Sequence, residues 1–141
     1  MQEKTQGTLP DIRQTIILNA PIHKVWEAVS TSEGIGAWFM PNNFKPILGF
    51  DFVLHAGQYG DSHCKVTELD PPNRLVFSWG RDWYVSFELK ELDGKTEFTL
   101  IHSGWEEGKE TEFGELHTVV RDRMDQGWGF IVQKLQKLVE A

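Results

Sequence analysis

The chain has only one cysteine, Cys64, so it cannot form an internal disulfide bond, and cytoplasmic residence is the default expectation. No apolar run approaches the ~20 residues of a transmembrane helix, and the polar start of the sequence lacks the apolar core of a signal peptide. Basic residues are scarce: 14 Lys and Arg stand against 21 Asp and Glu, which gives a net charge of −7. We therefore expect no binding to nucleic acid or to anionic membranes, because a basic face would favour both. The lack of a long apolar run predicts no membrane insertion.

Sequence motifs for catalysis and metal binding are also lacking. The five histidines do not pair at HxH, HxxxH or HExxH spacing, so we expect no metal and no cofactor. His23 and His117 fall in helical segments and are expected to be solvated. No serine lies in a G-x-S-x-G context, and no glycine-rich phosphate loop is present. The glutamates between 106 and 115 lie in a loop with glycine and lysine, which is typical of a solvated run. We expect a non-enzymatic protein.

Aromatic side chains are abundant, with six Trp and nine Phe among 141 residues. This length suits one domain, 1–141, which can bury roughly two thirds of its unfolded surface. A core of that size can enclose some spare volume, so the positions of the aromatic residues matter more than their number.

Hydrophobic periodicity predicts the order β–α–α, then a run of antiparallel strands, then one long helix. Pro21 suits the first turn of a short helix, and Thr31 or Ser32 can cap a second one. Asp93-Gly94 is a strong signal for a two-residue hairpin turn. The pattern predicts an α+β fold, in which a curved antiparallel sheet of about six strands is covered by the C-terminal helix, with two short helices after the first strand. The expected strands are 11–19, 50–56, 62–70, 73–80, 82–92 and 95–104.

Residues 115–141 give the clearest signal, a long amphipathic helix. Gly127 lies inside its apolar arc, where a core helix normally has a large side chain. A mid-helix glycine costs roughly 0.5–1 kcal/mol relative to alanine, so it indicates a need for space or close approach. Such a helix above an aromatic sheet can leave a ligand-sized cavity. The arc consists of Val120, Met124, Trp128, Ile131, Leu135, Leu138 and Val139.

Strand alternation decides which side chains face the helix. Cys64 and Val66 are placed inside with the aromatic residues. Two interpretations stay open: the rings fill a core, or they line a pocket that has few polar anchors. Candidate anchors are the indole N–H groups and the side chains of His102, Cys64 and Ser62. The inward-facing set is Phe77, Trp79, Trp83, Phe87, Phe98 and His102.

Several segments resemble the family related to the activator of heat-shock-protein ATPase, within the START/Bet v-like (SRPBCC) superfamily. They are APIHKVWEAV at 20–29, WF at 38–39 ahead of a proline, VTELDPPNRLVFSW at 66–79, TEFTLIH at 96–102 and the Gly127-Trp128 pair. The similarity covers nearly the whole chain. It implies a helix-grip fold with a cavity between sheet and helix, and small hydrophobic ligands such as lipids, polyketides or flavonoid-like aromatics.

The leading hypothesis is therefore non-enzymatic binding of a small hydrophobic, aromatic or lipid-like molecule, in a carrier, sensor or stress-response role. His102 is the preferred polar anchor, and Met124 can adjust to different ligand shapes. The expected ligand-binding residues are Trp38, Cys64, Phe77, Trp79, Trp83, Phe87, Phe98, His102, Met124, Gly127 and Trp128.

Two other functions are considered. One is a protein-interaction module that contacts a chaperone or another protein through the acidic loop 105–115, with Trp105 and Phe113 exposed. The other is a cyclase- or hydrolase-like enzyme that uses His102 with a pocket carboxylate or with Cys64.

Overall fold

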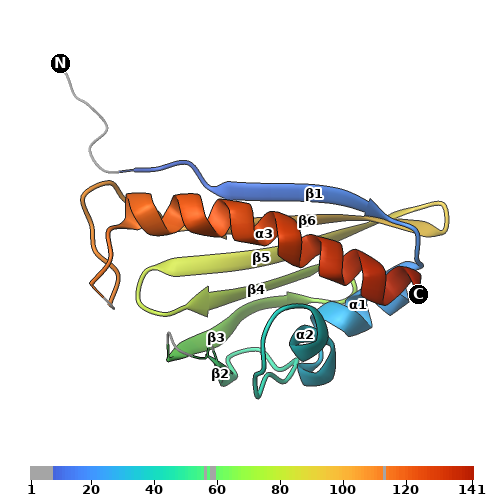
Figure 1. Ribbon diagram of the computed structural model, residues 1–141. Helices are drawn as coiled ribbons and strands as arrows, with labels where there is room; N and C mark the ends of the chain where they lie inside the picture. Colours follow the sequence, from blue (N-terminus) through green and yellow to red (C-terminus); the bar gives the residue numbers. More distant parts are fainter. Residues whose placement is uncertain (1–7, 56, 58–59, 113) are drawn as a thin grey trace.

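The computed structural model describes residues 8–55, 57, 60–112 and 114–141. Across these residues, one curved antiparallel sheet of six strands lies behind a long helix, with two short helices at one end (Figure 1). The strands are β1 (Ile12–Leu18), β2 (Asp51–His55), β3 (Asp61–Asp70), β4 (Arg74–Trp79), β5 (Trp83–Leu92) and β6 (Lys95–Ser103). This arrangement confirms the predicted fold class.

The sheet is a series of hairpins closed by the first strand. Strands β2 to β6 pair in sequence order, and β1 then pairs with β6, so the sheet order is β1-β6-β5-β4-β3-β2. The β5–β6 turn confirms the hairpin signal, because Asp93 and Gly94 both have positive φ, at 52° and 88°. Buried residues alternate along β5 and β6 as expected, whereas on β4 Val76 of the opposite face is buried as well.

The short helices α1 (Ile22–Val29) and α2 (Ser32–Trp38) fold back on each other at one end of the sheet. Thr31 caps α2, because its side-chain oxygen accepts a hydrogen bond from the Gly34 backbone N–H at 3.0 Å. Gly34 allows the close approach of the two helices: a Cβ there would lie 2.4 Å from the Ala28 carbonyl oxygen. The Trp38 indole N–H donates to that same carbonyl at 2.9 Å, which fixes the ring beneath the helix pair.

The long helix α3 (His117–Glu140) is rotated relative to the predicted arc. Met124 and Ile131 are only partly buried and Leu138 is 37% exposed, whereas Val132 is buried. The guanidinium group of Arg121 explains part of this rotation, because it donates to the Pro10 carbonyl at 2.7 Å and holds one flank of the helix towards β1. The fully buried stripe is His117, Val120, Trp128, Val132, Leu135 and Val139.

Gly127 therefore lies on the edge of the buried stripe rather than inside it. At 100° per residue, Gly127 falls on the same flank as Leu138, which lines a hollow with residues of α1 and α2. Gly129 falls on the opposite flank, the one that faces β1. A Cβ built at either glycine meets no heavy atom within 4 Å.

Gly104→Ala is expected to lower the free energy of unfolding more than Gly94→Ala. Both glycines have positive φ, so each alanine is strained by about 1–2 kcal/mol. At Gly104 the new Cβ would also lie 2.1 Å from the Asp82 carbonyl oxygen, so backbone must move, whereas nothing lies within 4 Å at Gly94. Urea denaturation measures both losses, and equal losses would contradict the close approach.

Candidate functional site

His102 lies at the centre of a group of tryptophan rings on the helix-facing side of the sheet. Its ring centroid is 5.3 Å from that of Trp79, 5.0 Å from Trp83, 4.6 Å from Trp105 and 5.9 Å from Trp128. These four rings come from β4, β5, the loop after β6 and α3, so sheet, loop and helix meet at the histidine. We call this set the tryptophan–histidine cluster.

Burial keeps the His102 imidazole neutral, and its hydrogen bonds determine which ring nitrogen carries the proton. The Trp128 indole N–H donates to His102 Nδ1 at 2.9 Å, and the Trp105 indole N–H donates to the His102 carbonyl oxygen at 3.0 Å. Burial, together with Arg121 and His117, lowers the pKa of His102 from 6.5 to about 3, so the imidazole is neutral at pH 7. An indole N–H can only donate, so Nδ1 must accept, and the single proton of the neutral ring is on Nε2.

Three polar nitrogens of this cluster lack a hydrogen-bond partner among the described residues. They are Trp79 Nε1, Trp83 Nε1 and His102 Nε2, and each is buried. A buried donor without a partner costs about 1–3 kcal/mol, so such groups in folded proteins need an explanation, and a ligand that accepts the hydrogen bond is one. These three are the residues that most strongly suggest a binding site.

Four of the other predicted lining residues form a second group, which we call the phenylalanine cluster: Trp38, Phe77, Phe87 and Phe98. Their rings lie 5.4 to 6.2 Å apart, and all four residues are buried. The one polar atom, Trp38 Nε1, has its partner in Ala28. The predicted aromatic lining thus falls into two clusters. Of these, only the tryptophan–histidine cluster contains buried nitrogens without a hydrogen-bond partner, which we call the open nitrogens.

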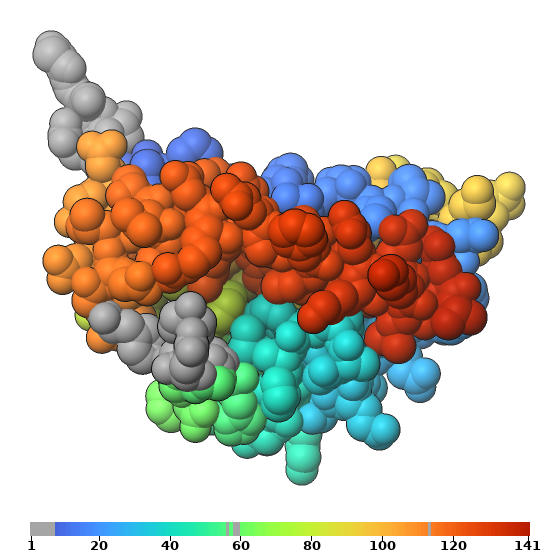
Figure 2. Space-filling view, in the orientation of Figure 1, coloured from blue at the N-terminus to red at the C-terminus, as the bar shows by residue number. Residues whose placement is uncertain are grey.

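Phe39, at the end of α2, joins the two clusters and was not among the predicted site residues. Its ring lies 4.9 Å from Trp128, 5.7 Å from Trp79 and 5.9 Å from Trp38. It is only partly buried, as is Met124. Figure 2 shows a recess between α3 and the segment around α2, with yellow-green atoms of the middle strands visible at its floor. The flank of α3 that carries Gly127 borders this side.

Cys64 is buried beside the cluster, as expected, and pairs in register with Trp79. Burial raises the pKa of its thiol to about 12, and its Sγ lies 3.7 Å from the Ser62 carbonyl oxygen. A thiol with so high a pKa is a poor nucleophile at neutral pH. Ser62 itself is half-buried on β3.

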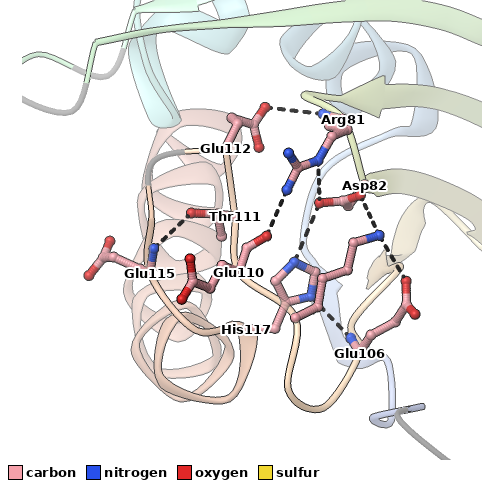
Figure 3. A network of polar contacts seen from close by, with 9 residues as sticks. Arg81, Asp82, Glu106, Glu110, Thr111, Glu112, Glu115 and His117 are labelled. Atoms are coloured by element: carbon pink, nitrogen blue, oxygen red, sulfur yellow. Dashed lines mark hydrogen bonds and ion pairs between the residues drawn. The ribbon is translucent and has the colours of Figure 1, made fainter.

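A polar network fixes the start of α3 beside the cluster (Figure 3). His117 is completely buried, which corrects the expectation that it is solvated. Its Nδ1 accepts from the Glu106 backbone N–H at 3.0 Å, and its Nε2 lies 3.5 Å from an oxygen of Asp82. Lys109 and Arg81 contact the Asp82 carboxylate at 2.8 and 3.2 Å. The carboxylate thus links the β4–β5 turn to the loop and to the helix.

In the loop 105–115, Trp105 does not have the exposed position that was expected. Trp105 is 2% exposed, because its ring packs between His102 and Trp83, with centroids 4.6 and 4.7 Å away. Phe113 lies outside the described residues. The loop instead carries charged side chains, and Glu112 accepts a hydrogen bond from the Arg81 backbone N–H at 3.1 Å.

The described residues show no arrangement for acid–base or metal chemistry at His102. No carboxylate among them is hydrogen-bonded to that histidine, and no three of their His, Cys, Asp or Glu side chains gather to hold a metal ion. A hollow elsewhere, of about 450 Å³, opens between α1, α2 and the end of α3, and both charged and apolar residues line it. A second hollow, of about 340 Å³, lies among charged residues of β4, β5 and β6.

Residues 19–140 match the family model described as Activator of Hsp90 ATPase homolog 1-like protein. The chain belongs to this family. The match confirms the resemblance and, with the sheet and helix described above, the helix-grip fold. Among the described residues, no helix is both long and apolar enough to cross a membrane. A search of the curated proteins gave no match.

Solved structures agree with this membership. The solution structure of Bacillus halodurans protein BH1534 has 44% sequence identity, covers 95% of this chain and 99% of its own, and gives a TM-score of 0.85. The Aha1 dimer from Colwellia psychrerythraea has 18% identity, coverage of 94% and 97%, and a TM-score of 0.77. DynU16, a putative protein in the dynemicin biosynthetic locus, has 22% identity, coverage of 93% and 47%, and a TM-score of 0.77. The last two show likeness of fold alone.

His102 is expected to remain a neutral ring with its proton on Nε2 between pH 5 and pH 8. Its pKa is lowered to about 3, so no protonation occurs in this window, whereas a histidine in the unfolded chain titrates near ~6.5. Long-range ¹⁵N–¹H NMR spectra distinguish the two tautomers, and spectra in urea provide the titrating reference. A proton on Nδ1 would contradict the assigned hydrogen bond from Trp128.

Asp82→Asn is expected to lower the free energy of unfolding at pH 7 by about 1–3 kcal/mol, because buried His117 loses the carboxylate that faces it. Burial tends to raise the pKa of the Asp82 carboxyl, but hydrogen bonds from Lys109 and Arg81 outweigh it and hold that pKa below its ordinary value. The stabilisation is therefore complete above about pH 4 and is lost as pH falls through the lowered pKa.

The difference in the free energy of unfolding between wild type and Asp82→Asn should consequently become smaller in acid. Urea unfolding at several pH values measures this difference. Asp51→Asn is the matched control, because the Asp51 side chain is 81% exposed and lies 4.0 Å from Lys65. An exposed pair of this kind contributes only about 0–1 kcal/mol. If the loss of unfolding free energy in Asp82→Asn does not depend on pH, the charge of the Asp82 carboxylate does not stabilise the fold as described.

Proposed function

We propose that the chain binds a small hydrophobic, aromatic or lipid-like molecule at the tryptophan–histidine cluster, as a non-enzymatic carrier or sensor in the cytoplasm. The observation that carries the proposal is the set of three buried nitrogens without partners, Trp79 Nε1, Trp83 Nε1 and His102 Nε2. Family membership supports a ligand-binding or Aha1-like module. The open nitrogens favour the first of these two.

The energetics of the cluster favour a guest with a large apolar surface and few polar atoms. Aromatic pairs add roughly 0.5–1.5 kcal/mol each beyond the burial of area, and tryptophan rings offer extensive faces for stacking. A ligand that satisfies even one open nitrogen also removes a desolvation penalty of about 1–3 kcal/mol. Together these contributions reach micromolar affinity without a charged anchor, since a Kd of ~1 μM corresponds to about −8 kcal/mol.

Access to the cluster would run along the flank of α3 that carries Gly127. The rings of Trp128 and Phe39 are in contact, so a guest must displace side chains as it enters. Phe39 and Met124 are the partly buried members on this side, and an unbranched methionine changes rotamer easily. Gly127 adds no side chain to this flank, and the space around its Cα is open.

A contact with an Hsp90-type chaperone is the second candidate function, supported by the description of the family. The outer surface of α3 exposes Val119 by 55% and Phe130 by 70%. These residues are eleven positions apart and share one helix face. Stimulation of the ATPase of a purified bacterial Hsp90, lost on Phe130→Ser but not on Gly127→Leu, would favour this function over ligand binding.

Gly127→Leu is expected to weaken ligand binding at least about tenfold, which corresponds to ~1.4 kcal/mol, because the leucine occupies the route to the cluster. Gly129→Leu is the matched control: it places the same side chain in open space on the opposite flank of α3 and should change affinity less than about twofold.

Tryptophan fluorescence and ¹H–¹⁵N NMR titrations with a flavonoid, a fatty acid and a sterol measure these affinities. Circular dichroism confirms that both variants remain folded. Absence of any saturable change with all three ligand classes, or equal losses from the two leucines, would sink the proposal.

A further inference from the structure

We infer that the ligand at the tryptophan–histidine cluster carries a neutral hydrogen-bond acceptor, a carbonyl oxygen on an aromatic framework, and no donor in that position. This inference rests on the proposed function, because it specifies the ligand of the same site. It follows from the chemical identity of the groups that the folded chain leaves open.

The histidine is the group whose role is not obvious, because an imidazole nitrogen can either donate or accept. At His102 the choice is fixed by Trp128, whose indole N–H occupies Nδ1 at 2.9 Å. Since the ring is neutral, Nε2 carries the hydrogen. The open nitrogen of His102 is therefore a donor.

The two open tryptophan nitrogens are donors by their chemistry, since indole has no acceptor. Their ring centroids lie 5.4 Å apart, and those of Trp79 and Trp83 lie 5.3 and 5.0 Å from that of His102, so the three rings that carry these donors are direct neighbours. The nearby acceptor, the His102 carbonyl oxygen, is already taken by Trp105. A ligand that reaches these rings therefore meets several N–H donors that lack an acceptor.

The charges around the cluster also favour an oxygen with partial negative charge. Arg121 is a permanent cation whose electrostatic influence reaches His102. The nearby carboxylate, Asp82, is compensated by Lys109 and Arg81. A full carboxylate on the ligand is disfavoured, because no cation in the described part of the chain is hydrogen-bonded to these nitrogens and a buried charge needs a partner. A ketone, quinone or lactone oxygen fits these donors better.

Three planar tricyclic molecules of nearly equal shape test the inference: 9-fluorenone, fluorene and carbazole. Fluorenone presents a carbonyl oxygen, fluorene presents no polar atom, and carbazole presents only an N–H. A site built to hydrogen-bond a ligand discriminates strongly against an analogue that leaves its polar groups unpaired. We expect fluorenone to bind at least about tenfold more tightly than fluorene, and carbazole to bind most weakly.

The indole N–H signals in ¹H–¹⁵N NMR spectra of the folded wild-type protein show where the oxygen lies. The N–H signals of Trp79 or Trp83 should move downfield with fluorenone and not with fluorene. Trp38, Trp105 and Trp128 are internal controls, because their N–H groups already have partners in the chain. Trp79→Phe and Trp83→Phe, which remove one N–H each, should lower the ratio of fluorenone to fluorene affinity towards one.

The possible outcomes distinguish this inference from the proposed function on which it rests. Equal affinities for fluorenone and fluorene, or preference for carbazole, would overturn the inference and leave ligand binding intact. Failure of all three molecules to bind would overturn both for aromatic ligands. A downfield shift at Trp79 or Trp83 together with tighter fluorenone binding supports both.

Discussion

The hydrogen bond from the Trp128 indole to His102 joins the long helix to strand β6 of the sheet, and much of the structure depends on it. Both partners are buried, so the bond replaces water at two polar atoms that would otherwise be costly to enclose. It sets which face of α3 points inward, and it fixes the hydrogen of the imidazole on the opposite side of the ring. This hydrogen bond therefore determines that His102 offers a ligand a donor, although the ligand does not contact the bond itself.

The charged residues lie outside the cluster of aromatic rings. The ion pairs that surround Asp82 gather where the β4–β5 turn, the loop after β6 and the first residue of α3 meet. They hold the helix at its start, while Arg121 holds its flank towards β1. Because these contacts are made outside the ring cluster, the interior needs no ion to stay assembled. An apolar region with a few neutral donors can then be maintained within a strongly acidic protein.

Much of the fold could be predicted from the sequence, because alternation and periodicity are properties of single strands and helices. Period two placed Trp79, Trp83 and His102 on one face, and all three are buried together. Trp105 and His117 were missed because they lie where the chain leaves β6 and enters α3, and no period governs that segment. The rotation of α3 was missed because Arg121 binds the backbone of a segment more than a hundred residues away.

The position of α3 in the chain has a consequence for biosynthesis. All six strands precede it, so their aromatic face is translated before the helix that covers it. At about 5–20 residues per second, the 24 residues of α3 take roughly one to five seconds to emerge. During that interval the tryptophans of the sheet are not yet covered by the helix, and the nascent chain must remain soluble with an apolar surface exposed.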